Sequence, residues 1–122
     1  MASKKILVVD DEPGFSQLVI EYFKAMGYDS ISAESAEEGM ALFKRHKPRV
    51  VILDFNMPLV TGDKFLPILQ NMDPMVKVIV ISGCIEEEVE EKFRGLGYFH
   101  FFEKGTLSLE KLKLKVDEAL TY

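Results

Sequence analysis

The chain has 122 residues, of which 48% are apolar and 29% charged, and its formal net charge is −5. A chain of this length fits one domain with a sizeable core, and we predict a single domain over residues 1–122. A nucleic-acid-binding module would carry a basic patch, so this charge balance argues against one. The single cysteine, Cys84, excludes an intramolecular disulfide and is interpreted as a structural thiol.

The start of the chain does not have the pattern of a targeting or membrane segment. Residues 1–5 are basic, but the apolar run behind them covers only residues 6–9 before Asp10 and Asp11 interrupt it. A signal peptide or a membrane-spanning helix needs a much longer apolar stretch. We therefore expect a cytoplasmic protein without membrane attachment.

Short apolar runs alternate with helical patterns along the whole chain. In chain order we predict a strand at 6–9, a helix at 15–26, a strand at 28–34, a helix at 35–47, a strand at 50–53, a helix at 64–72, a strand at 76–81, a helix at 86–96, a strand at 99–102 and a helix at 109–120. Gly27 and Pro48 are placed to end the first two helices, and Ser35 to Glu38 forms a capping box. Pro67 is expected in the first turn of the third helix. Strict alternation of strands and helices predicts a parallel sheet covered by helices on both faces.

Polar side chains follow four of the predicted strands, at the point where each strand ends. Asp10 and Asp11 follow the first strand, Asp54 the third, Ser82 the fourth and Lys104 the fifth. Because ligands of open parallel sheets bind beyond the carboxyl ends of the strands, we expect these side chains to meet in a site. Any one of them alone is compatible with an ordinary helix cap, but their joint placement indicates a function.

Three carboxylates at one edge would repel one another. Two unit charges ~4 Å apart cost about 4 kcal/mol at an effective dielectric constant near 20, so the cluster needs a cation. Oxygen ligands favour Mg²⁺, Mn²⁺ or Ca²⁺, and a site of few carboxylates with waters and phosphate suits Mg²⁺ best. Glu12, which follows the first pair of acids, is expected to cap the next helix or to face solvent.

Four segments, residues 6–13, 51–62, 78–83 and 97–104, contain these acids, the hydroxyl and the lysine at fixed spacings. In this order they resemble the receiver domains of bacterial two-component response regulators, and the resemblance covers essentially the whole chain. Each segment alone is a weak motif, whereas the four together are specific. The resemblance implies a doubly wound (βα)5 fold of the α/β class, with a five-stranded parallel sheet in the flavodoxin-like and CheY-like order 2-1-3-4-5.

The resemblance also implies a chemistry. Asp54 would accept a phosphoryl group from a sensor histidine kinase or a histidine phosphotransfer protein, in a reaction that depends on Mg²⁺. Asp10, Asp11, Asp54 and the backbone carbonyl of Asn56 would hold the ion. Lys104 would neutralise charge on the transferring phosphoryl oxygens, as phosphoryl transfer requires.

A conformational switch is implied as well. Ser82 would donate its hydroxyl to the attached group, and Phe101 would move from an exposed to a buried rotamer, signalling to a downstream protein or output domain. A homodimer through the fourth helix, fifth strand and fifth helix is a further expected contact, whereas nucleic acid and membrane are not expected partners. Gly105 stands where the family usually has proline, so we expect a more mobile loop after Lys104.

Three other functions fit the pattern less well. An aspartate-nucleophile phosphohydrolase needs a second acid two residues after its nucleophile, where this chain has Asn56. We therefore expect a signalling switch rather than an enzyme, although slow self-dephosphorylation of Asp54 is compatible with the site. A receiver-like module that is never phosphorylated would lack an acid, the lysine or the hydroxyl. A nucleotide or flavin domain would carry a glycine-rich loop after the first strand.

Overall fold

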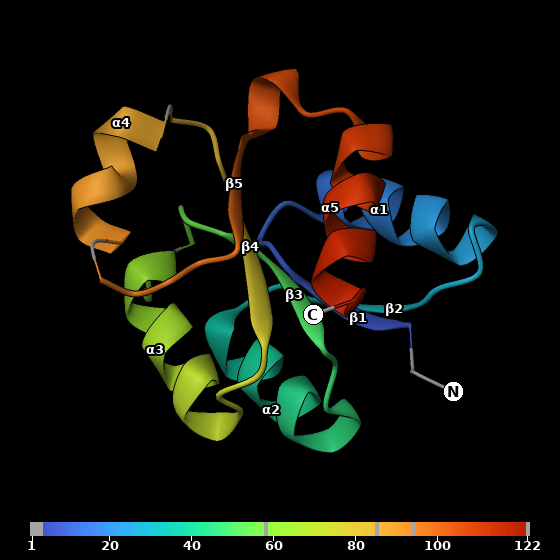
Figure 1. The fold of residues 1–122 in the computed structure, drawn as a ribbon, viewed down its shortest axis with the longest axis horizontal. Helices are drawn as coiled ribbons and strands as arrows, with labels where there is room; N and C mark the ends of the chain where they lie inside the picture. The colour runs from blue at the N-terminus through green and yellow to red at the C-terminus, as the bar shows by residue number, and fades with distance from the viewer. Residues whose placement is uncertain (1–3, 58, 85, 94, 122) are drawn as a thin grey trace.

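The computed structural model describes residues 4–57, 59–84, 86–93 and 95–121. In this part of the chain, parallel strands form one sheet in the order β2-β1-β3-β4-β5 (Figure 1). The strands are β1 Lys5–Val9, β2 Asp29–Ala33, β3 Val50–Asp54, β4 Lys77–Ser82 and β5 His100–Glu103. The helices are α1 Pro13–Ala25, α2 Ala36–His46, α3 Gly62–Met72, α4 Glu86–Val89 and α5 Leu109–Thr121, with 3-10 turns η1 Glu90–Phe93 and η2 Lys104–Thr106. The predicted fold class and strand order are confirmed.

The sheet separates two apolar cores. The helices α1 and α5 cover one face, whereas α2, α3 and α4 cover the other (Figure 1). Successive side chains of a strand point to opposite faces, so β1 places Ile6 and Val8 in the first core and Leu7 and Val9 in the second. No helix in the described ranges is both long and apolar enough to cross a membrane.

Local sequence signals fix several helix ends. The hydroxyl of Ser35 accepts a hydrogen bond from the backbone N–H of Glu38 at 3.1 Å, and the Glu38 carboxylate accepts one from the N–H of Glu34 at 2.7 Å. The first bond is half of the capping box that the sequence predicts, whereas the second reaches the N–H of the residue before the N-cap Ser35 rather than that of Ser35 itself. Gly27 follows α1 with a φ of 90°, the left-handed conformation that favours glycine at this position.

The fourth helix is shorter than predicted. It ends at Val89 and continues only as the 3-10 turn Glu90–Phe93, short of residue 96. Glutamates occupy most of positions 86–91, and like charges repel one another along a short helix. Beyond the turn, Gly95 and Gly97 adopt φ values of 79° and 71°, which a helix cannot include. The fifth strand also starts one residue later than predicted.

The third helix corrects the placement of Pro67. The helix begins at Gly62 rather than at residue 64, so Pro67 lies in its interior and not in its first turn. A proline there cannot donate to the carbonyl of Asp63, and its ring crowds that carbonyl. The apolar residues Phe65, Leu66 and Leu69 are fully buried, and their packing keeps the helix continuous despite the proline.

We expect Pro67→Ala to raise the free energy of unfolding by about 1 kcal/mol, because alanine restores the missing N–H donor and removes the ring from the preceding turn. Urea unfolding of the variant and the wild type measures the change. The control is Ile68→Ala at the next, partly exposed position, which should not stabilise the protein. A less stable Pro67→Ala would mean that ring packing outweighs the backbone defect.

Candidate functional site

Three carboxylates meet beyond the carboxyl ends of β1 and β3. Asp10 and Asp11 follow β1, and Asp54 is the last residue of β3. One oxygen of each carboxylate lies within 4.8 Å of the others. The two strands are paired in parallel, with Val9 opposite Leu53, so their ends reach the same edge. The convergence of the three acids predicted from the sequence is therefore present in the structure.

Burial and charge repulsion together raise the pKa of Asp54 to about 6. Burial is the larger cause, and the neighbouring Asp10 carboxylate adds to it. The N–H of Asn56, which donates to Oδ1 of Asp54 at 3.2 Å, and the charge of Lys104 act in the opposite direction. Burial also raises the pKa of Asp10, which is fully inaccessible to solvent. Ionising both acids at neutral pH is therefore costly without a nearby cation.

The donor set fits a hard divalent cation. The three side chains offer only carboxylate oxygens, which suit Mg²⁺ or Ca²⁺ rather than a metal that prefers nitrogen or sulfur. Oδ2 of Asp10 is buried and has no hydrogen-bond donor in the described residues that satisfies normal geometry, although it lies 2.9 Å from the Lys104 ammonium. A buried oxygen of this kind is available as a ligand.

Lys104 places a positive charge at the same edge. Its Nζ lies 2.9 Å from Oδ2 of Asp10 and 3.8 Å from Oδ2 of Asp54, and it also pairs with the Glu12 carboxylate. The ammonium lies 4.6 Å from the centre of the Phe15 ring, a cation–π arrangement. Burial alone would lower the pKa of Lys104, but its bonds to the two acids and the charge of Asp54 raise the pKa above the usual value.

Ser82 ends the strand next to Asp54. Asp54 pairs with Ile81 across β3 and β4, which places Ser82 one residue further along the neighbouring strand. The Ser82 side chain is fully buried, and its Oγ accepts the N–H of Cys84 at 3.0 Å. A hydroxyl held in this way still has its own proton to donate to an acceptor at the site.

Phe101 corrects one expectation. The sequence suggested an exposed resting rotamer, but the side chain is only 9% exposed and belongs to the core beneath α3 and α4. Its ring packs edge-on against Tyr98, with 6.3 Å between the ring centres. The physical reason is that a phenylalanine ring has no hydroxyl to keep in water, so the inward position removes the whole ring from solvent.

Glu12 is the site residue that the sequence reasoning missed. It is the N-cap of α1, as expected, yet its side chain makes no capping hydrogen bond. Its carboxylate instead contacts Lys104, 92 residues away in the chain. No local pattern marks such a pair, because only the folded loop after β5 brings the lysine to this edge. Phe15 was missed for the same reason.

Comparisons with known proteins agree with the geometry. Residues 6–117 match the family model of the response regulator receiver domain. Sporulation initiation phosphotransferase F of Bacillus subtilis (strain 168) is 28% identical over 104 residues, which cover 85% of this chain and 84% of that protein. A probable transcriptional regulator, ycf27, of Porphyridium aerugineum is 33% identical over 96 residues, which cover 79% of this chain but only 39% of that protein.

A solved structure matches the fold over nearly its full length. The response regulator receiver domain protein from Clostridium thermocellum superposes with a TM-score of 0.88 at 26% identity. The alignment covers 96% of this chain and 94% of that one. The chain thus matches nearly the whole of that receiver domain protein, whereas it spans well under half of the longer regulator from Porphyridium.

The raised pKa of Asp54 predicts a pH dependence of stability in the absence of metal. The unfolded chain releases this proton near the usual aspartate value, about 3.9, whereas the folded protein holds it to about pH 6. Between these values the folded state binds more protons, so stability falls as pH rises through this window. We expect Asp54→Asn to be more stable than wild type by about 1–3 kcal/mol at pH 7 in EDTA, with the difference vanishing below about pH 4.

Unfolding in urea across this pH range measures the effect. The control is Asp73→Asn, because Oδ1 of Asp73 also accepts an N–H two residues further on, from Met75 at 3.0 Å. Asp73 lies outside the acidic cluster, so its variant should not gain stability at pH 7. A wild type as stable as Asp54→Asn at pH 7 would contradict the electrostatic strain.

Glu12 gives a second prediction. We expect Glu12→Gln to lower the pKa of the Lys104 ammonium, because the variant removes a negative charge in direct contact with it. The free energy of unfolding should change by less than about 1 kcal/mol, since the Glu12 side chain is 65% exposed and its ion pair is screened. Lysine side-chain NMR across a pH titration reads the first effect. Glu37→Gln on α2 is the control, and an unchanged Lys104 titration in Glu12→Gln would refute the contact.

Proposed function

The chain belongs to the response regulator receiver domain family, and we propose that it is a phosphorylation-dependent switch in which Asp54 accepts the phosphoryl group. The observation that carries this proposal is the convergence of Asp10, Asp11, Asp54 and Lys104 at one edge of the sheet. Phosphoryl transfer needs little covalent chemistry from a protein. It depends instead on positioning the reactants and on neutralising the charge of the transferring group.

The proposed transfer step breaks one bond for the bond that it forms. A carboxylate oxygen of Asp54 attacks the phosphorus of a phosphohistidine on a sensor kinase or a histidine phosphotransfer protein. An O–P bond forms, the N–P bond breaks, and the electron pair stays on the imidazole nitrogen. The N–H of Asn56 orients the attacking carboxylate, and Lys104 stands 3.8 Å from its other oxygen, ready to bind a phosphoryl oxygen.

The acidic cluster supports a metal requirement. We propose that Asp10, Asp11, Asp54 and the backbone carbonyl of Asn56 hold Mg²⁺, which when bound neutralises charge on the phosphoryl oxygens. The protein's own contribution is to keep the Asp10 and Asp54 carboxylates out of water, with the more exposed Asp11 carboxylate close to them, before the donor arrives. That arrangement is costly in the metal-free protein, as the raised pKa of Asp54 indicates.

We propose that Ser82 responds to the phosphoryl group on Asp54 by hydrogen bonding to it. Its hydroxyl can donate to a phosphoryl oxygen while its Oγ continues to accept the N–H of Cys84. A shift of Ser82 toward the phosphoryl group would therefore carry the start of the β4–α4 loop with it. Because Phe101 is already buried, its inward position would be held more firmly by phosphorylation rather than created by it.

The partners follow from the family and are proposals. The phosphodonor is a histidine kinase or a histidine phosphotransfer protein, and the receiving surface is the face made by α4, β5 and α5, through which a homodimer is also proposed. The two relatives differ in length. One is a protein that the match covers over 84% of its length, and the other is a longer transcriptional regulator, so either arrangement is compatible with the proposal. Cytoplasmic location and slow self-dephosphorylation remain predictions.

We expect a small phosphodonor such as phosphoramidate, together with Mg²⁺, to add one phosphoryl group to the wild type and none to Asp54→Ala. Intact mass spectrometry under mild conditions measures the product. Asp11→Asn should react much more slowly, and Asp73→Ala, an acid outside the cluster, should react normally. An adduct that persists in Asp54→Ala would refute the assignment.

The same preparation tests the switch. Ser82→Ala should still bind beryllofluoride at Asp54, but the amide NMR shifts over residues 86–112 should be smaller than in the wild type. Equal shifts in both proteins would mean that the signal does not pass through the Ser82 hydroxyl.

A further inference from the structure

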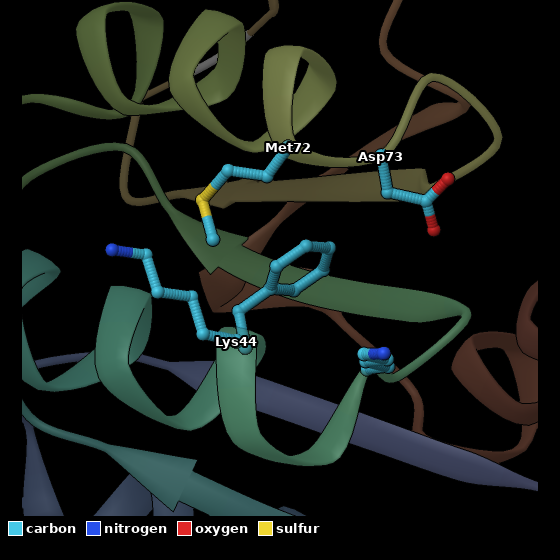
Figure 2. Close-up of a pocket in the computed structure, with 5 residues that line it drawn as sticks. Lys44, Met72 and Asp73 are labelled. Atoms are coloured by element: carbon cyan, nitrogen blue, oxygen red, sulfur yellow. The ribbon is translucent and has the colours of Figure 1, made fainter.

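A hollow of about 460 Å³ lies between the C-terminal ends of α2 and α3, away from the acidic cluster (Figure 2). It is lined by Phe43, Lys44, Lys47, Met72 and Asp73. These helix ends precede β3 and β4, so the hollow lies at the amino edge of the sheet, opposite Asp54. Figure 2 shows Met72 reaching from α3 toward α2, with Lys44 and Asp73 on either side.

The lining is apolar at the base and basic at the rim. Phe43 is buried with 3% of its surface exposed, and Met72 is partly buried against the same core. Lys44 and Lys47 are exposed, and neither forms an ion pair with any side chain in the described ranges. The hollow therefore offers an apolar contact surface beside two positive charges that form no ion pair with the described residues.

The positive charge is concentrated here although the chain as a whole is acidic. Residues 44–49 read Lys-Arg-His-Lys-Pro-Arg, in a protein whose net charge is −5. Lys44 and Arg45 lie in the last turn of α2, where they complement the helix dipole. Lys47 lies beyond the helix in the left-handed conformation, with a φ of 49°, at a position where glycine or asparagine is usual. Lys47 is therefore a side chain in an unusual backbone position at the end of α2, beside Lys44 at the rim of the hollow.

We propose that this hollow docks an acidic segment of a partner protein, which inserts one large apolar side chain against Phe43 and Met72. Carboxylates on either side of that anchor would pair with Lys44 and Lys47. An apolar anchor in a pocket with a charged rim is the usual arrangement of a binding hot spot. Charge complementarity between the two lysines and carboxylates selects the acidic partner, and the chain's net charge of −5 disfavours a long polyanion such as a nucleic acid backbone.

The position of the hollow makes the docking independent of phosphorylation. The amino edge of the sheet is separated from Asp54 by the full length of β3. The contact would hold a partner in place whichever state the acidic edge is in. This inference does not rest on the proposed phosphoryl chemistry, and the same experiment can be run on Asp54→Ala.

The chain has no tryptophan, so a peptide tryptophan can be observed without background. The probe is the peptide Glu-Glu-Trp-Glu-Glu, compared with Glu-Glu-Ser-Glu-Glu and Lys-Lys-Trp-Lys-Lys. We expect the tryptophan emission of the first peptide to shift to shorter wavelength and its binding curve to saturate. The amide NMR shifts of the protein should centre on residues 43–47 and 72–73. The other two peptides should bind at least about tenfold more weakly. Wild type and Asp54→Ala should behave alike.

The matched variants decide the outcome. Lys44→Glu/Lys47→Glu should weaken the peptide about tenfold or more, and added salt should reduce the difference. Lys24→Glu/Lys111→Glu makes the same change in net charge at two exposed positions elsewhere and should leave affinity nearly unchanged. Equal loss in both pairs, shifts outside the hollow, the absence of saturation, or tighter binding of an oligonucleotide of equal charge would each overturn the proposal.

Discussion

The burial of carboxylates at the ends of two apolar strands is the constraint on which the site depends. β1 is buried on both faces from Ile6 to Val9, and β3 is buried throughout, so the residues that follow them start inside the protein. Asp10 and Asp54 are consequently almost inaccessible to water. A surface loop could bring three acids together at little cost, but it would also leave their charges screened. The strand ends hold the charges of Asp10 and Asp54 away from solvent, and this is the physical basis of the proposed Mg²⁺ site.

Within the protein, the Lys104 ammonium partly neutralises these buried carboxylates. It stands closer to Asp10 and Glu12 than to Asp54, which leaves the oxygens of Asp54 less neutralised than those of its neighbours. An incoming phosphoryl group would therefore compete with Glu12 for the ammonium. Gly105 is exposed, and a Cβ at that position would meet nothing, so no steric contact of its own fixes the loop that carries Lys104. The side-chain contacts of Lys104 thus take over the positioning that a proline would assist.

The site residues that could be predicted from the sequence are those at the ends of the strands. A residue that follows an all-apolar strand lies at the carboxyl edge of a parallel sheet. The positions of Asp10, Asp54 and Ser82 could therefore be predicted from the sequence pattern alone. The contact of Glu12 with Lys104 depends on how a loop folds back over the sheet, which no periodic pattern encodes. The inward rotamer of Phe101 depends on the packing around Tyr98, and that packing is a property of the assembled core.

The predicted length of the fourth helix was wrong for a different reason. The apolar spacing of Val89 and Phe93 suits a longer helix, and both side chains are indeed buried. The glutamates between and before them repel one another, and the left-handed glycines that follow end the segment early. The periodicity records which side chains enter the core, but it does not record the electrostatic cost of the turns between them.

That cost makes α4 the element best suited to move. A helix of four residues has too few internal hydrogen bonds to be stable alone, so it depends on Val89 and Phe93 in the core and on the bond from the Tyr98 hydroxyl to the Glu86 carboxylate. It starts four residues after Ser82, whose Oγ already holds the N–H of Cys84. A small displacement of Ser82 on phosphorylation would act on this short, weakly held segment rather than on a rigid helix. The proposed switch would therefore not require Phe101 to cross from solvent to core. It would require only that the buried ring and the marginal helix exchange one packing for another on the same face of the sheet.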